Sequence, residues 1–302
     1  MVTGANGFLG QHLLQQLQEK NIKVTATGRG PSRVMIATSP DLTYRELDIR
    51  NGNDVQEFIM RDQPEIIIHA AAMTQVDECE INKQECYNIN VTATRFLISA
   101  AKEINAKLIY ISTDFVFDGS RGPYREDDIP DPVNYYGSTK LAAEKAVMES
   151  GLDWAIARTV LIYGDIIEVS RKNFVTWVRQ NLEAGNKIKV VTDQWRTPTF
   201  VHDLVRGIIL IIEKNASGIY HLSGKEMMTP YEMAIQTARF FGLDEHLIEK
   251  TESSAFQQSG KRPSKTGFNI EKAQRELGYD PVSFKEGLKL TFIETNDGLT
   301  KP

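Results

Sequence analysis

Val2-Thr3-Gly4-Ala5-Asn6-Gly7-Phe8-Leu9-Gly10 opens the chain, and the leucines that follow it fall at helical spacing. Glycines between a strand end and a helix start permit a tight turn, and they let backbone N–H groups approach a pyrophosphate at the helix N-terminus. Ordinary turns also contain glycine triplets, but this context predicts a dinucleotide-binding turn. Only Met1, Val2 and Thr3 precede the first glycine, so either the central strand is short or native residues precede Met1.

Downstream of this turn, short apolar runs alternate with amphipathic stretches. The candidate strands are 23–27, 65–69, 107–112, 153–158 and 219–222, and the candidate helices between them include 88–104 and 136–149. This alternation predicts an α/β fold, a Rossmann-type doubly wound parallel sheet.

The regular alternation ends near residue 160. We expect a dinucleotide-binding domain over 1–160, with a return segment near 197–222. After residue 160, 171–183 has a helical pattern and 187–200 an extended one, and from Thr229 the chain is mostly helical and polar. Residues 161–196 and 223–302 are therefore expected to form a smaller, mostly helical C-terminal lobe that binds substrate.

Composition excludes several classes of function. The chain has 302 residues, 41% of them hydrophobic, and a formal net charge of -5, so no general basic field attracts nucleic acid. Cys79 and Cys86 form neither a disulfide framework nor a metal-binding pattern, and the five histidines are scattered. No metal site is predicted. The longest apolar run, 208–212, is too short to span a bilayer, so we expect a cytoplasmic protein without a membrane partner.

Tyr136 and Lys140 lie one helical turn apart in Tyr135-Tyr136-Gly137-Ser138-Thr139-Lys140. On one helix face, the lysine cation favours the phenolate, which makes the phenol a proton donor near neutral pH. This is chemistry for reducing a carbonyl. The same spacing also occurs on solvated helix faces, so the pair gains its meaning from the glycine turn upstream.

Polar and small residues follow two other candidate strands. Ser112-Thr113-Asp114 comes directly after one strand, at the edge of the sheet where ligands of parallel sheets collect, and a hydroxyl there can bind a substrate carbonyl. Ala70-Ala71-Ala72 follows another strand and leaves room for a ribose or a flat ring. A turn-capping cluster and a helix-packing surface are the respective alternatives.

The end of the second strand bears on the cofactor. NAD-binding sites usually have a carboxylate there, whereas an arginine accommodates the 2′-phosphate of NADP. The segment is Thr27-Gly28-Arg29, with Arg33 close behind. We therefore expect NADPH, with NADH as the alternative; an exposed arginine without a ligand is the other interpretation.

Together these segments resemble the extended short-chain dehydrogenase/reductase superfamily, and within it the dTDP-4-dehydrorhamnose reductase-like family. The resemblance covers nearly the whole chain, and its motifs occur in the expected order. They are the glycine turn, His69-Ala70-Ala71-Ala72, Ser112-Thr113-Asp114-Phe115-Val116-Phe117-Asp118-Gly119, Pro123-Tyr124 with Glu126, the segment 132–144 around Tyr136, Arg158-Thr159, Gln194, Pro198-Thr199 and Leu277-Gly278-Tyr279.

The resemblance implies a catalytic set of Thr113, Tyr136 and Lys140. Tyr136 protonates the sugar carbonyl oxygen as hydride arrives from the nicotinamide, Lys140 lowers the pKa of the tyrosine and binds the nicotinamide ribose, and Thr113 holds the oxygen. The implied substrate is a nucleotide-linked 4-keto-6-deoxy sugar, with Thr113, Asp114, Asn173 and Arg262 as substrate-binding residues. The implied cofactor-binding residues, with Arg29 from the preceding argument, are Gly4, Gly7, Phe8, Leu9, Gly10, Arg29, Asp48, Ile49, Ala70, Ala71, Ala72, Ile111, Tyr136 and Lys140.

Two departures from the family pattern leave the particular sugar open. Rhamnose-forming reductases typically carry a tryptophan after Arg-Thr, where this chain has Val160-Leu161, and Trp195-Arg196 differs from the usual short residues after Gln194.

Two other functions are implied as alternatives. The chain also resembles the regulatory beta subunit of methionine adenosyltransferase, which belongs to the same branch, binds a dinucleotide and serves a partner enzyme. A nucleotide-sugar epimerase or dehydratase retains tightly bound NAD, and the lack of an acidic residue over 27–29 argues against it. Superfamily members are commonly dimers, so the resemblance allows a homodimer.

Overall fold

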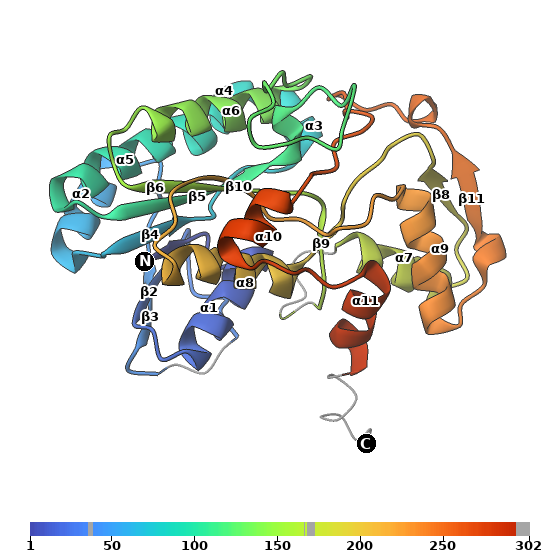
Figure 1. Ribbon diagram of the computed structural model, residues 1–302, viewed down its shortest axis with the longest axis horizontal. Helices are drawn as coiled ribbons and strands as arrows, with labels where there is room; N and C mark the ends of the chain where they lie inside the picture. The colour runs from blue at the N-terminus through green and yellow to red at the C-terminus, as the bar shows by residue number, and fades with distance from the viewer. Residues whose placement is uncertain (36–38, 166, 168–172, 294–302) are drawn as a thin grey trace.

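A seven-stranded parallel sheet forms the centre of the computed structural model, which describes residues 1–35, 39–165, 167 and 173–293 (Figure 1). The strands lie in the order β10-β6-β5-β4-β1-β2-β3. This order confirms the predicted doubly wound α/β fold and reverses direction between β1 and β4, the point where such sheets bind ligands. The bounds are β1 Val2–Thr3, β2 Val24–Gly28, β3 Leu42–Glu46, β4 Ile66–His69, β5 Lys107–Thr113, β6 Trp154–Thr159 and β10 Gly218–His221.

Helices cover both faces of the sheet (Figure 1). On one face lie α2 (Gly52–Asp62), α5 (Ala93–Ile104) and α6 (Tyr135–Met148); on the other lie α1 (Phe8–Glu19), α8 (Val201–Glu213) and α10 (Glu271–Leu277). Successive side chains of a strand point to opposite faces. In β5, Leu108 and Tyr110 therefore join the core with α2, α5 and α6, whereas Ile109 and Ile111 join the core with α1, α8 and α10.

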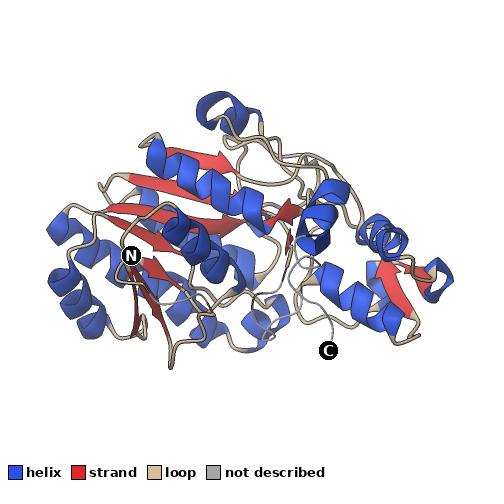
Figure 2. Ribbon diagram, turned by 90° about the horizontal axis from the view of Figure 1, so that it is seen from below, coloured by secondary structure: helices blue, strands red, loops and turns tan. Residues whose placement is uncertain are grey.

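The later segments build a second group of elements, at the right of Figures 1 and 2. It contains α7 (Phe174–Glu183), α9 (Pro230–Phe241) and α11 (Phe284–Ile293), with two small parallel sheets. These sheets pair β8 (Ile188–Val191) with β11 (Ile248–Thr251), and β7 (Ile162–Tyr163) with β9 (Thr199–Phe200). None of the helices within the described ranges is long and apolar enough to cross a membrane.

Short helical turns complete the chain. They are α3 (Val76–Ile81), α4 (Lys83–Tyr87), a π-helical turn η1 (Asn88–Thr92) that leads directly into α5, and the 3-10 turns η2 (Asp114–Val116), η3 (Glu245–Leu247) and η4 (Ser253–Ala255).

The structure differs from the sequence-based expectation at a few elements. Strand β3 was not predicted, because this edge strand exposes most of its side chains and has no apolar run. Strand β1 contains only two residues, which agrees with the expectation of a short central strand, and it pairs with β2 and β4 on its two sides. The helix expected over 171–183 begins at Phe174, and positions 171 and 172 lie outside the described residues. The expected domain boundaries stay a prediction.

Candidate functional site

A cavity of about 910 Å³ lies along the carboxyl ends of the central strands and extends to α7, β8 and the segment before α10. It lies where the strand order reverses, as expected for an open α/β sheet. The structure brings to this cavity all the residues predicted to bind the cofactor and all three predicted catalytic residues, whose roles stay predictions. They are Gly4, Gly7, Phe8, Leu9, Gly10, Arg29, Asp48, Ile49, Ala70, Ala71, Ala72, Ile111, Thr113, Tyr136 and Lys140.

The glycine turn fits a closely approaching pyrophosphate. Gly4 has a φ of +72°, and a Cβ there would lie 2.8 Å from the backbone nitrogen of Ala71. A Cβ on Gly10 would collide with the carbonyl oxygen of Gly4. Helix α1 starts after Gly7 with no side-chain cap and no acidic residue in its first turn. Its positive end therefore meets the cavity without a competing carboxylate, which suits a dinucleotide phosphate.

The loop after β2 presents two arginines to the cavity. Arg29 and Arg33 are exposed and line its wall. Asn6 fixes this loop beside the glycine turn, because its Oδ1 accepts from the Arg33 backbone N–H at 2.8 Å and its Nδ2 donates to the Tyr44 hydroxyl at 2.9 Å. Two cations at this place suit the 2′-phosphate of NADP.

The loop after β3 contributes Asp48 and Ile49. The Asp48 carboxylate accepts from Arg50 Nε at 2.9 Å, and this hydrogen bond holds the pKa of Asp48 below its ordinary value. Arg50 also donates to Glu85 at 2.6 Å. Asp48 therefore lines the cavity as a paired carboxylate.

Thr113 and Tyr136 meet at the end of β5. Thr113 is the last residue of β5, Tyr136 lies in the first turn of α6, and both residues line the cavity. Asn134 caps α6 by accepting from the Gly137 backbone N–H at 2.8 Å. Gly137 allows the helix to approach η2, because a Cβ there would collide with the Phe115 carbonyl oxygen.

Lys140 lies one turn further along α6. Its Nζ donates to the Ile111 carbonyl oxygen at 2.7 Å and lies 4.1 Å from the ring centre of Tyr110. Burial lowers the pKa of Lys140 to about 7, although the Glu144 carboxylate acts to raise it.

Burial determines the protonation of Tyr136. It raises the pKa of Tyr136 above its ordinary value, and the nearby Thr113 hydroxyl opposes this only in part. The lowering that we expected from Lys140 does not appear: desolvation of the buried phenolate has the largest effect, and the Asp114 carboxylate raises the pKa of Tyr136 further. The phenol therefore keeps its proton at neutral pH.

Asp114 lies beside Thr113 and is tied into the protein. It accepts hydrogen bonds from Thr113 at 3.1 Å and from Thr266, and the Nε of Arg196 lies 3.7 Å from its carboxylate. Burial raises the pKa of Asp114. Arg196 in turn donates to the Pro263 carbonyl oxygen at 2.7 Å. Asp114 therefore holds the segments that contain Arg196 and Thr266. Its contact with a sugar stays a prediction.

The two remaining predicted substrate residues lie in different settings. Arg262 lines the cavity, but its guanidinium binds Asp77 with both terminal nitrogens, one of them at 2.7 Å. Asn173 does not line the cavity. It caps α7, accepting from the Thr176 backbone N–H at 3.1 Å, and the next residue, Phe174, reaches the wall.

One buried polar residue near the site was not predicted. Asn90 lies in the π-helical turn, and its side chain accepts from the Met73 backbone N–H at 2.8 Å and donates to Thr139 at 3.0 Å. It thereby joins the loop after β4 to α6. No composition or spacing signal marks it, because a π-turn and its partners depend on the fold. Trp177 and Thr74 also line the cavity and were not predicted.

The chain is similar to a known protein family, to curated proteins and to solved structures. The family described as RmlD substrate binding domain matches residues 1–296. The chain is 36% identical over 261 residues to methionine adenosyltransferase 2 subunit beta of Bos taurus, covering 84% of this chain and 75% of the relative. It is 31% identical over 284 residues to dTDP-4-keto-6-deoxy-D-glucose reductase of Streptomyces niveus, covering 93% and 92%. The crystal structure of dTDP-4-dehydrorhamnose reductase from Bacillus anthracis in complex with NADP has a TM-score of 0.85 and 32% identity, covering 97% of this chain and 98% of that one.

Proposed function

Because the chain belongs to the RmlD substrate binding domain family, we propose that it is an NAD(P)H-dependent reductase of a nucleotide-linked 4-keto-6-deoxy sugar. The observation that carries the proposal is the meeting of Thr113, Tyr136 and Lys140 in one cavity with the glycine turn. The substrate class is that named for the Streptomyces niveus relative, and the cofactor is that of the Bacillus anthracis structure.

Proton transfer is the task of Tyr136. A bound nicotinamide supplies a hydride to the carbonyl carbon. Tyr136 donates its phenolic proton to the carbonyl oxygen, so that the ketone becomes an alcohol. The raised pKa suits this role, because the phenol is protonated at neutral pH before the reaction. Thr113, which lines the same cavity as Tyr136, holds the same oxygen.

Lys140 and the arginines hold the cofactor. Lys140, anchored on the Ile111 carbonyl, binds the nicotinamide ribose and orients the cofactor beside Tyr136. The N-terminus of α1 and the glycine turn bind the pyrophosphate. Arg29 and Arg33 bind the 2′-phosphate, which favours NADPH over NADH.

The substrate nucleotide occupies the end of the cavity built by the second group. Phe174 and Trp177 offer apolar and aromatic surface there, and Gln194 offers an amide. Arg262 supplies positive charge for a diphosphate and is held in place by Asp77.

The direct test is NADPH oxidation by the purified chain with a dTDP-4-dehydro-6-deoxy sugar, followed by absorbance. We expect turnover by the wild type and a loss of about 100-fold or more in kcat for Tyr136→Phe, the range for one general acid. NADPH binding, measured by calorimetry, should persist in the variant. Tyr135→Phe is the matched control, because that neighbour is only half-buried and should leave kcat nearly unchanged.

A second candidate function follows from the sequence comparison. A relative that is 36% identical is a subunit of methionine adenosyltransferase 2, so a dinucleotide-binding regulatory subunit is the alternative. Two results together would favour this alternative over the reductase. The first is cofactor binding without turnover on any 4-keto-6-deoxy sugar, and the second is co-elution of the chain with a methionine adenosyltransferase catalytic subunit in size-exclusion chromatography.

A further inference from the structure

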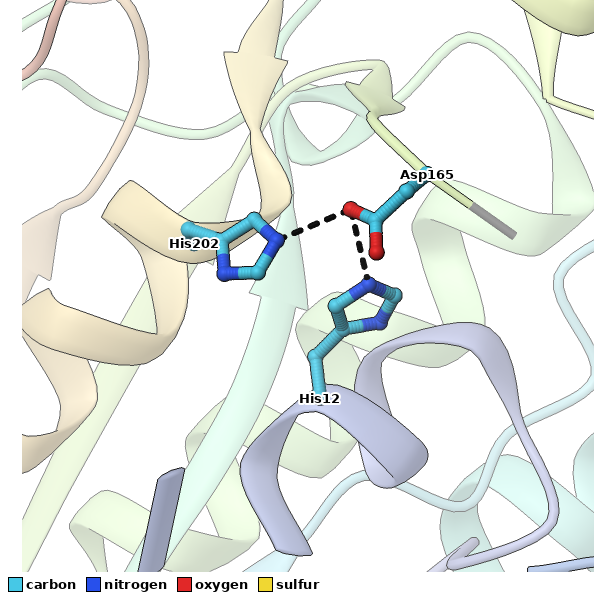
Figure 3. Close-up of side chains that lie close together, drawn as sticks. All are labelled: His12, Asp165 and His202. Carbon is cyan, nitrogen blue, oxygen red and sulfur yellow. Dashed lines mark hydrogen bonds and ion pairs between the residues drawn. The ribbon is translucent and has the colours of Figure 1, made fainter. Parts of the chain in front are cut away.

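Three side chains with metal-binding atoms meet beside α1, outside the cavity (Figure 3). His12 comes from α1, His202 from the first turn of α8, and Asp165 from the segment after β7. His12 Nε2 lies 3.3 Å from Asp165 Oδ1, and His202 Nε2 lies 2.8 Å from the same oxygen. The ligand atoms of all three lie within 4.8 Å of one another. The histidines are far apart in the sequence, which is why no metal site was predicted.

The two ring nitrogens of His12 have different surroundings. Its side chain is 0% exposed, and its Nδ1 donates to the Phe8 carbonyl oxygen at 2.9 Å. A neutral ring with its proton on Nδ1 carries a lone pair on Nε2. That nitrogen is buried, makes no hydrogen bond to any residue that the structure describes, and faces a carboxylate oxygen. A lone pair directed at a carboxylate is unfavourable, so this contact needs either a proton on His12 Nε2, which makes it an ion pair, or a cation between the two atoms.

The separations suit a tetrahedral metal ion. Zinc–ligand bonds of about 2.0–2.2 Å at tetrahedral angles place the ligand atoms about 3.3 Å apart. The His12–Asp165 distance of 3.3 Å matches this spacing. His202 must move outward by a few tenths of an ångström, and its side chain, 31% exposed, has room to do so.

The surroundings of both rings also resemble a metal site. Metal-binding histidines usually direct their second ring nitrogen at a hydrogen-bond acceptor that fixes the ring. The Phe8 carbonyl does this for His12. The side-chain amide of Gln16 lies 3.4 Å from His202 Nδ1, and rotating this amide by half a turn offers its oxygen to that nitrogen.

We propose that His12, His202 and Asp165 bind a divalent transition metal ion, with zinc as the best fit. Two imidazole nitrogens and one carboxylate suit zinc and its neighbours, whereas magnesium and calcium take mainly oxygen ligands. Asp165 and His202 are partly exposed, at 27% and 31%, so the ion enters from solvent and keeps a water molecule as its fourth ligand.

The ion links parts of the cavity wall without taking part in the reaction. None of its three ligands lines the cavity. However, α1 begins at the glycine turn, and Leu161 and Ile162, which precede Asp165, line the cavity on another side. The ion therefore joins α1 to the β7 segment and to α8, and it stabilises their arrangement.

Zinc binding to an untagged chain, stripped with EDTA and desalted, tests the site. We expect calorimetry to show one Zn²⁺ per chain and the melting temperature to rise with Zn²⁺ and fall again with EDTA, because a ligand of the folded state stabilises it. Co²⁺ should give the intense visible bands of a tetrahedral site. Mg²⁺ at the same concentration should leave the melting temperature unchanged.

Two variants assign the binding to these residues. His202→Gln and Asp165→Asn alter partly exposed ligands, so the fold should persist, as circular dichroism will check. Each variant should weaken Zn²⁺ binding by about 100-fold or more. Mutating a residue that only hydrogen-bonds to a metal ligand typically weakens metal binding by about 10- to 100-fold. His246→Gln, on the exposed η3 turn, is the matched control. No Zn²⁺ binding at millimolar concentration, or binding of equal strength in both variants, would overturn the proposal.

Discussion

Burial controls the acid–base behaviour of Lys140. Its ammonium lies between the Ile111 carbonyl and the ring of Tyr110, and its pKa falls from the ordinary 10.5 to about 7. Between these two values the unfolded chain binds more protons than the folded chain at this position. The free energy of unfolding therefore rises with pH in this window, and the contribution is lost as pH falls toward the folded pKa.

Lys140→Met removes this titration. Relative to the variant, the wild type should gain stability from about pH 7 to about pH 10, by at most about 1.4 kcal/mol per pH unit. Loss of the hydrogen bond to Ile111 adds a pH-independent offset of about 1 kcal/mol, so the slope is the test. Urea unfolding across this pH range measures it. Lys145→Met, on the exposed side of the same helix, is the control; parallel curves for the wild type and Lys140→Met would contradict the expected burial effect.

Among the elements, α7 depends on Asn173, the residue that caps its N-terminus. Asn173 accepts from the Thr176 backbone N–H, the Thr176 hydroxyl accepts from the Asn173 N–H at 3.1 Å, and Asn173 Nδ2 donates to the Gly164 carbonyl oxygen at 2.7 Å. This capping box satisfies groups that the helix end leaves unpaired. The helix in turn carries Phe174 and Trp177 to the cavity.

Asn173 can be tested as a cap and as a substrate residue in one series. Asn173→Ala should lower the free energy of unfolding by about 1 kcal/mol, whereas Asn173→Ser, a good capping residue, should restore most of it. Urea unfolding checks both. We expect KM for the sugar nucleotide to stay near the wild-type value in the serine variant. A KM raised alike in both variants, with stability unchanged, would instead support a direct contact with substrate.

Elements with local sequence signals could be predicted, and those that depend on distant partners could not. The glycine turn and the Tyr136–Lys140 pair are each defined by residues close together in the sequence, so their pattern was visible. Strand β3 lacks an apolar run because it is an edge strand. The Asn90 bridge, the Asp77–Arg262 pair and the cluster around Asp165 join residues brought together only by the folded chain.

At the scale of the whole molecule, an ion pair ties one wall of the cavity to α3. Phe256, Gln258 and Arg262 line the cavity, and Arg262 binds Asp77 on α3. Asp77 also accepts from the Gly260 backbone N–H at 3.0 Å. These contacts hold the segment 256–262 against the sheet domain.

Asp77→Asn should loosen this segment. We expect trypsin to cleave after the exposed Lys261 several-fold faster in the variant, because cleavage follows the population of the open form. Mass spectrometry of timed digests measures the rate. Glu213→Gln, which removes the exposed pair with Lys20, should leave it unchanged. An equal cleavage rate in Asp77→Asn would show that other contacts hold the segment.

Acid stability of the whole sheet depends on His69. This ring is buried between β1 and α5, with Nδ1 2.8 Å from Thr3 Oγ1 and Nε2 3.1 Å from Thr94 Oγ1. Burial, aided by the charge of Lys140, lowers its pKa from 6.5 to about 3. Between these values the unfolded chain binds the extra proton, so the stabilisation is complete above the ordinary pKa and is lost as pH falls through the folded one.

His69→Asn should flatten the acid side of the stability profile. The wild type should lose up to about 1.4 kcal/mol per pH unit from this group as pH falls from about 6.5 to about 3, and the variant should lack that part. The variant is less stable at neutral pH, because the ring's packing and hydrogen bonds are lost, but its curve approaches that of the wild type in acid. Urea unfolding at several pH values measures the slopes, with the surface variant His246→Asn as the control. Equal slopes in wild type and His69→Asn would mean that carboxylates alone, among them Asp77 with its pKa lowered to about 2 by Arg262, govern acid unfolding.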